Sequence, residues 1–134
     1  MSDAQFRKFY WPGLKKSLQT HVDLGYVPVP VFEAKFGDRL EYLLELPKGK
    51  ILPIIDAEDA FTAKEILGGH TSQVVICPNS SKVWPISKLE SYIKEIIDGC
   101  GEDGGLVLGV LIPNNAKIED IQAMLESVRE YGKY

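Results

Sequence analysis

The sequence predicts an α/β fold that is half of a (βα)8 TIM-type barrel: a leading helix followed by four parallel βα units. Short apolar runs rich in β-branched residues alternate four times with amphipathic helical segments. Strands separated in this way pair in parallel, because a parallel pair needs a long crossover connection. The chain has 134 residues, about half of the roughly 250 in a complete barrel of this kind.

The leading helix is expected to begin at a capping box. Ser2 and Gln5 have the Ser-x-x-Gln spacing in which each side chain accepts a backbone N–H of the first turn. An apolar stripe follows at helical spacing, formed by Phe6, Phe9, Tyr10, Leu14 and Leu18. Pro12 interrupts this segment, and we expect a bend there because proline has no amide hydrogen and crowds the preceding turn.

Four strand and helix pairs come next. The strands are expected at residues 27–32, 51–55, 73–77 and 106–112. The helices are expected at residues 38–46, 59–69, 87–97 and 118–128. Asp59 is the expected N-cap of the second of these helices.

Composition excludes several classes of protein. A net charge of −4 and a pI near 5.2 do not provide the basic surface that a nucleic-acid-binding protein needs. The longest apolar run, residues 106–113, is too short to span a membrane, and the N-terminus has no signal-peptide core. We therefore expect a cytoplasmic protein with one domain, residues 1–134. Its two cysteines, Cys77 and Cys100, have no metal-ligand spacing and are expected to be reduced.

Candidate site residues follow the strands, because chemistry in βα barrels is located at the carboxyl ends of the strands. Glu33 and Asp56 end two consecutive strands and are the candidate catalytic residues, since neighbouring carboxylates can share a proton or bind a cation. The candidate ligand-binding residues are Asp59, Asn79 and Trp84. The alternative is that the carboxylates are solvated and that Asp59 only caps a helix. We predict no metal site.

Other polar residues have simpler interpretations. His21 lies late in the first helix, and His70 follows Gly68 and Gly69 at a helix end, on the side opposite the expected site. We expect both histidines to be structural. Cys77 and Cys100 are expected to be inert, because free cysteine is usually a small buried apolar residue.

Two prolines occur in the first expected strand. Pro28 and Pro30 are two residues apart, so both remove donors along the same side of the strand. We expect that side to be the free edge of the sheet, poorly suited to further pairing. Because an open four-stranded sheet leaves one apolar face uncovered, we expect either a face-packed dimer or a closed barrel of two chains.

The chain resembles the uroporphyrinogen decarboxylase-like superfamily, which includes cobalamin-dependent methyltransferases. The matching segments cover nearly the whole chain in order and correspond to the C-terminal half of the family barrel. They are residues 6–14 with their FYWP core, 39–50 (RLEYLLELPKGK), 63–68, 104–113 and 123–134. The resemblance implies a complementary half-barrel chain or a homodimer, and a possible corrinoid protein as partner.

The departures from the family pattern concern the metal. The resemblance implies a His-x-Cys zinc pair where this chain has Val31, Phe32 and Glu33, and a Cys turn near residues 108–113, which contain no Cys. The usual Gly-Asn turn is replaced by residues 77–81. No cofactor is predicted, and zinc or corrinoid enters only by family analogy. We expect a half-length protein without the full catalytic and zinc-ligand set, acting as a dimer or partner subunit. The alternative is an active methyltransferase or decarboxylase with a composite site between two chains.

Overall fold

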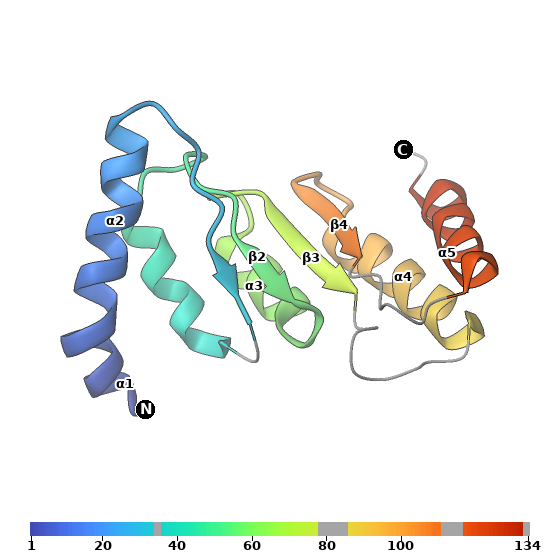
Figure 1. Cartoon of the computed structure of the whole chain (residues 1–134), viewed down its shortest axis with the longest axis horizontal. Coiled ribbons are helices and arrows are strands. Elements are labelled where there is room, and N and C mark those ends of the chain that lie inside the picture. The colour runs from blue at the N-terminus through green and yellow to red at the C-terminus, as the bar shows by residue number, and fades with distance from the viewer. Residues whose placement is uncertain (34–35, 78–85, 111–116, 133–134) are drawn as a thin grey trace.

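The chain forms a parallel sheet with helices packed on it (Figure 1). The computed structural model describes residues 1–33, 36–77, 86–110 and 117–132, without the side chains of residues 77, 86, 87 and 110. The described strands are β1 (Val31–Phe32), β2 (Ile54–Asp56), β3 (Gln73–Cys77) and β4 (Leu106–Val110). All neighbours are parallel and follow the order β1-β2-β3-β4. The prediction of a parallel α/β fold is confirmed.

Helices precede and follow the strands as expected. The first helical segment comprises α1 (Asp3–Gln5), the π turn η1 (Phe6–Tyr10) and α2 (Trp11–Asp23). The others are η2 (Gly37–Glu45), η3 (Ala57–Asp59), α3 (Ala60–Leu67), α4 (Ile86–Cys100) and α5 (Ile118–Tyr131). The segment η2, expected to be α-helical, is a 3-10 helix of nine residues, which is long for this tighter winding.

The leading helix begins as the sequence predicts and adapts to its proline. The amide of Ser2 donates to Gln5 Oε1 at 2.9 Å, and the amide of Gln5 donates to Ser2 Oγ at 3.3 Å. This capping box is confirmed. The π turn η1 ends at Tyr10, two residues before Pro12, and we attribute this local widening to the missing amide hydrogen and the bulk of the proline ring.

The sheet has one covered face and one open face. Phe32, Ile55 and Val75 are 5%, 0% and 0% exposed and pack in the cores beneath the helices. Their strand neighbours point the other way because successive side chains alternate between the faces. Of these, Val31 is 57% exposed. In Figure 1, α3 lies behind β2 and β3, and no described helix covers the side of the strands toward the viewer.

Close packing on the open face depends on Gly109 of β4. A Cβ atom at this position would lie 2.6 Å from Ile76 Cδ1 and 3.3 Å from Val74 Cγ1, both on β3. Any larger residue would therefore displace these two side chains. The side chains of Ile76 and Val74 therefore fill the space above Gly109 on the open face.

The expectation about the two prolines was wrong. The carbonyl of Pro28 accepts from the amide of Leu52 at 3.0 Å, and the carbonyl of Pro30 accepts from the amide of Ile54 at 2.8 Å. The prolines therefore face β2, where they shorten β1 to two residues by removing donors from that ladder. Since alternate residues point to opposite sides, the backbone groups of Val29 and Val31 point to the free edge.

Candidate functional site

The two candidate catalytic carboxylates lie at neighbouring positions of the sheet. Phe32 of β1 is opposite Ile55 of β2 in the parallel register. Glu33 directly follows Phe32 in the sequence, and Asp56 directly follows Ile55. Adjacent strands are about 4.8 Å apart. By alternation, Glu33 and Asp56 lie on the same face as Val31, which is the open face. The structure therefore brings these two residues together at one corner of the sheet.

The two carboxylates differ in their surroundings. Glu33 is exposed, whereas Asp56 is half-buried and its Oδ1 accepts from the amide of Glu58 at 3.3 Å. This contact caps the short helix η3 and fixes the orientation of the Asp56 side chain. Such a pair can bind a cation or exchange a proton with a ligand. Among the described residues, no group of three or more His, Cys, Asp or Glu side chains is arranged to hold a metal ion.

The side chain of Asp59 forms hydrogen bonds with the backbone of the same chain. The residue occupies the N-cap position of α3, but its side chain makes no capping hydrogen bond, so the expected capping contact was wrong. Its Oδ2 instead accepts from the amides of Phe36 and Gly37, the latter at 3.2 Å. Asp59 is 1% exposed. The carboxylate therefore anchors the segment that follows Glu33 on the covered side of the sheet.

The remaining predicted residues separate into two groups. The side chain of Cys77, together with Asn79 and Trp84, lies outside the described residues. Nδ1 of His21 lies 2.8 Å from the carbonyl of Ser17, a contact within its own helix. Cys100 is 1% exposed, and burial raises the pKa of its thiol, although Lys64 acts in the opposite direction. A thiol of this kind is a poor nucleophile, as expected.

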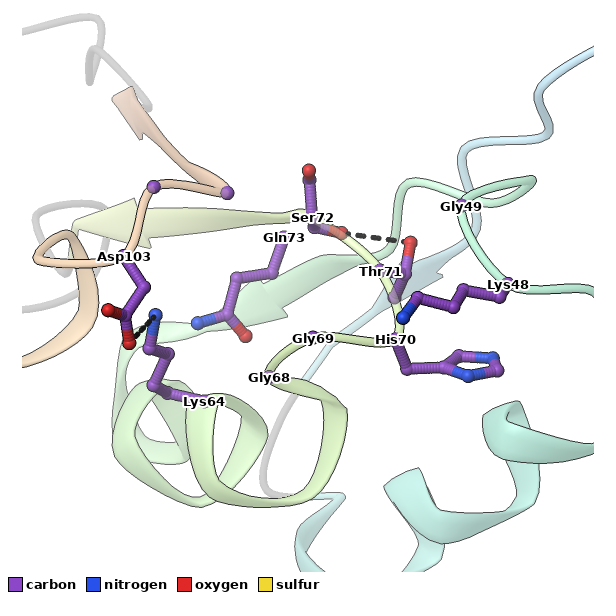
Figure 2. Close-up of a pocket in the computed structure, with 12 residues that line it drawn as sticks. Lys48, Gly49, Lys64, Gly68, Gly69, His70, Thr71, Ser72, Gln73 and Asp103 are labelled. Atoms are coloured by element: carbon purple, nitrogen blue, oxygen red, sulfur yellow. Dashed lines mark hydrogen bonds and ion pairs between the residues drawn. The ribbon is translucent and has the colours of Figure 1, made fainter.

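A cavity at the amino ends of the strands was not predicted. It has a volume of about 750 Å³ and is formed by three segments: the loop before β2, the turn between α3 and β3, and the turn before β4. Figure 2 shows Lys48 and His70 on one side of this cavity and Lys64, Gln73 and Asp103 on the other. Nε2 of His70 lies 3.1 Å from the carbonyl of Leu46, which gives the imidazole the structural role expected of it.

The charges in the cavity are only partly balanced. Lys64 Nζ lies 4.0 Å from Asp103 Oδ2, at the limit of an ion pair. The Lys64 side chain is 23% exposed, whereas that of Asp103 is 88% exposed, so the carboxylate is largely solvated while the lysine side chain is mostly buried. Lys48 adds a second positive charge to the lining.

Gln73 is the most buried polar group in the lining. It is 3% exposed, and its Nε2 donates to the carbonyl of Ala60 at 3.5 Å. Its Oε1 is buried and has no hydrogen-bond partner among the described residues. One feature of the sequence could have indicated this cavity. Gln73 is a polar residue at the start of an apolar strand, and it lies between the pairs Gly68-Gly69 and Gly104-Gly105.

Comparison with protein-family models, curated protein sequences and solved structures finds no match. The resemblance to the uroporphyrinogen decarboxylase-like superfamily therefore stays a prediction carried by the residues quoted for it. Within the described part of the chain, none of the helices is long and apolar enough to cross a membrane.

Proposed function

We propose that the chain is a half-barrel subunit that pairs with a second copy of itself to form a parallel barrel of eight strands. The open face of the sheet is the observation that carries this proposal. Apart from Glu33 and Asp56 at the carboxyl ends of β1 and β2, the residues that form this face are apolar: Val27, Val29, Val31, Ile54, Val74, Ile76, Val107 and Gly109. Branched aliphatic residues of this kind fill the interior of βα barrels.

The exposure of this face favours a partner over a free monomer. Val27, Val29, Val31 and Val107 are 54%, 47%, 57% and 49% exposed. A contiguous apolar surface of this kind marks an interaction site, because water contact with it is unfavourable. A second copy presents the same branched residues, so two open faces can interdigitate as the two halves of one interior.

The strand edges support a closed barrel rather than a face-packed dimer. Val29 and Val31 direct backbone groups to the free edge of β1. The amide of Gln73 donates to the carbonyl of Gly105 at 2.8 Å, so the backbone groups of Leu106 and Leu108 point away from β3, to the free edge of β4. A two-fold axis along the barrel places β1 of one copy beside β4 of the other, parallel and with donors and acceptors on both edges.

The proposed role follows from the family resemblance and from this assembly together. A half-length uroporphyrinogen decarboxylase-like protein without the zinc ligands would act as a dimer or as a partner subunit. The carboxyl ends of all eight strands would then lie at one mouth of the barrel. A corrinoid protein is the partner that the resemblance suggests for that mouth.

Sedimentation of the full chain tests the assembly. We expect a dimer for the wild type and a monomer for Val31→Lys, because the substitution places a charge inside the proposed barrel. Leu24→Lys is the matched control, since Leu24 is 67% exposed at the end of α2, away from the sheet. The proposal would be contradicted if the wild-type chain stays monomeric at about 100 μM, a concentration well above the Kd of a stable dimer.

A composite enzyme site is the second candidate, favoured by the register that places Glu33 beside Asp56. In a closed barrel both copies contribute this pair to one mouth. By family resemblance, the chemistry would be decarboxylation of uroporphyrinogen or methyl transfer from methylcobalamin. If wild-type dimer turns over either substrate, Glu33→Gln and Asp56→Asn should each abolish turnover without changing the sedimentation. A dimer inactive on both substrates would exclude this candidate.

A further inference from the structure

We propose that the cavity at the amino ends of the strands binds phosphate, either free or as a small monoester, through Lys64, Lys48 and Gln73. The cavity belongs entirely to one chain and opens at the end opposite Glu33 and Asp56. It is therefore independent of barrel closure.

The charge of the cavity selects an anion. Lys64 and Lys48 line it with one carboxylate, Asp103, whose contact with Lys64 is 4.0 Å long and whose side chain is mostly in water. An ammonium group whose one ion pair is this long, and whose counterion is mostly hydrated, attracts a second anionic partner. Lysine binds phosphate as a point charge in this way.

The second observation concerns the hydrogen bond that Gln73 lacks. Its Oε1 is an acceptor, and it is buried in the lining without a described partner. Leaving such a group unsatisfied is unfavourable, so a ligand that donates a hydrogen bond would be favoured. In Figure 2 the side chain of Gln73 extends from β3 toward Lys64, with its amide nitrogen nearer to Lys64 than its oxygen. A ligand beside Lys64 would therefore contact the positive charge directly and reach the shielded Oε1 after rotation of the Gln73 amide.

Inorganic phosphate near neutral pH meets both requirements, because it is anionic and carries at least one O–H group. Sulfate has the same tetrahedral shape and the charge of the phosphate dianion, but it has no hydrogen to donate. Donation of the phosphate O–H to Gln73 Oε1 would therefore make phosphate bind more tightly than sulfate, whereas the lysines alone would bind both ions. The cavity exceeds the size of a single phosphate ion, which leaves room for the organic part of a monoester.

The walls leave the backbone accessible. Gly69 and Gly104 have φ angles of +75° and +74°, which residues with a Cβ atom rarely adopt. A Cβ atom at either position would meet nothing within 4 Å, so these glycines are required by the turns and not by packing. Their effect is a wall without side chains on two sides of the cavity.

Phosphorus NMR and calorimetric titration of the full chain test the site, with inorganic phosphate, glycerol 3-phosphate and sulfate as probes. We expect saturable phosphate binding, with sulfate at least about tenfold weaker, because sulfate leaves Gln73 Oε1 without a donor. Tighter binding of glycerol 3-phosphate than of phosphate would identify a monoester as ligand, and equal binding would identify the free ion.

Variants separate the two contacts. Lys64→Met should weaken phosphate and sulfate alike by about tenfold. Gln73→Leu should weaken phosphate alone and remove the preference over sulfate. Lys16→Met is the control for the charge change, because Lys16 is exposed on α2. A thermal melt of each variant verifies folding, and Gln73→Leu should melt no lower than the wild type because it removes an unsatisfied buried acceptor.

Three results would overturn the proposal: no saturable binding up to about 10 mM phosphate, equal binding of phosphate and sulfate by the wild type, or equal effects of Lys64→Met and Lys16→Met. The monomeric variant Val31→Lys should bind phosphate as the wild type does. A failure of barrel closure and a failure of this site are therefore distinguishable.

Discussion

The two faces of the sheet are made from neighbouring residues of the same strands, yet they have opposite surroundings. Ile55 is fully buried beneath α3, whereas the adjacent Ile54 is partly exposed on the open face. Val75 and Val74 form a second pair of this kind on β3. Because the residue types match, composition does not distinguish the two faces. Only the helices do, since they return over one face after every strand.

The stability of a single chain comes mainly from the covered face of the sheet. The covered face is packed against two aliphatic and aromatic cores, so its side chains contribute to folding of a single chain. The open face contributes to folding only when a second layer covers it. The same hydrophobic residues therefore act in two different equilibria, unfolding and association, and substitutions can separate the two.

The largest predicted difference is in the free energy of unfolding, between variants in which Ile55 or Ile54 is replaced by alanine. Ile55→Ala should lower the free energy of unfolding by about 2–5 kcal/mol, because it leaves a cavity in a packed core. Ile54→Ala should have a much smaller effect at low protein concentration, where the open face is wet. Urea denaturation measures both values.

Urea denaturation of the same two variants at high protein concentration tests whether the open face is buried in a dimer. If two open faces pack together, the destabilisation by Ile54→Ala should grow with protein concentration, because dimer formation adds to apparent stability. The loss in Ile55→Ala contains a term that does not depend on concentration. Equal losses in the two variants at low concentration would contradict the assignment of the faces.

A smaller effect is expected at Asp59, which anchors the segment after Glu33 on the covered side. Asp59→Ala leaves the amides of Phe36 and Gly37 without their acceptor, and the free energy of unfolding should fall by about 1–3 kcal/mol. Hydrogen exchange should show faster exchange at these two amides. Asp120→Ala, an exposed acid in the first turn of α5, should change neither quantity appreciably.

The strands illustrate what the sequence could predict. Residues 73–77 were predicted with the bounds that β3 has, because the run is apolar and lies between clear turn residues. The strand expected at residues 27–32 is two residues long. Its prolines were recognised, but the side of the strand that they face depends on the register with β2, and the register depends on contacts that are distant in sequence.

The candidate sites show the same limit. The positions of Glu33 and Asp56 at neighbouring strand ends follow from the parallel topology, so a βα pattern suffices to place them. The amino-end cavity combines Lys48 and Asp103, from two connections, with Gln73 at the start of β3, and these positions are separated by tens of residues. No local motif contains them. Only the packing of the three connections around the ends of β2, β3 and β4 brings these groups together.

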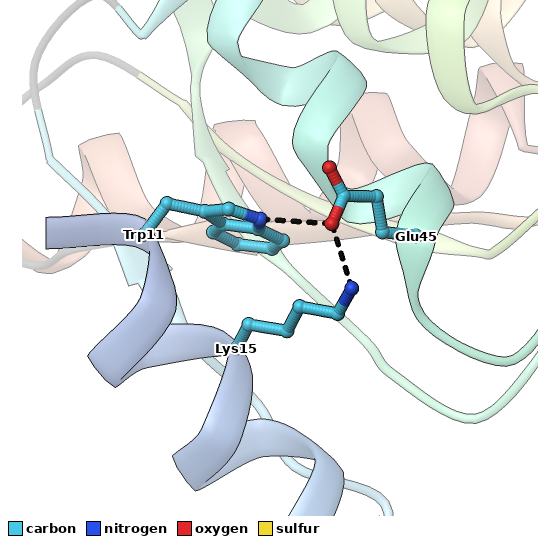
Figure 3. A network of polar contacts seen from close by, with 3 residues as sticks. All are labelled: Trp11, Lys15 and Glu45. Carbon is cyan, nitrogen blue, oxygen red and sulfur yellow. Dashed lines mark hydrogen bonds and ion pairs between the residues drawn. The ribbon is translucent and has the colours of Figure 1, made fainter. Parts of the chain in front are cut away.

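The smallest predicted effect concerns the outermost layer of the covered side, where α2 packs on η2. Glu45 Oε2 accepts from Lys15 Nζ at 2.7 Å and from the indole Nε1 of Trp11 at 3.1 Å (Figure 3). These two hydrogen bonds, first that of Lys15 and then that of Trp11, lower the pKa of the Glu45 carboxyl. Because the carboxylate is about half exposed, solvent screens the interaction and its contribution is less than about 1 kcal/mol.

The sign of the pH dependence follows from the direction of this shift. A carboxyl whose pKa is lower in the folded chain stabilises it above the pKa of the unfolded chain, about 4.3 for glutamate. That contribution is lost as the pH falls through the lowered value. Glu45→Gln should therefore be slightly less stable than the wild type at pH 7, and the gap should close toward about pH 3. Urea midpoints at both pH values measure the gap.

Glu41→Gln is the matched control, because Glu41 is exposed on the same helix η2 and the substitution removes the same charge. Its difference from the wild type should not follow the pattern of Glu45→Gln. A gap for Glu45→Gln that persists at acid pH would mean that the neutral amide packs poorly against Trp11. A gap of the same size in both variants would assign the effect to net charge, and the contact between α2 and η2 would then depend on its aromatic packing alone.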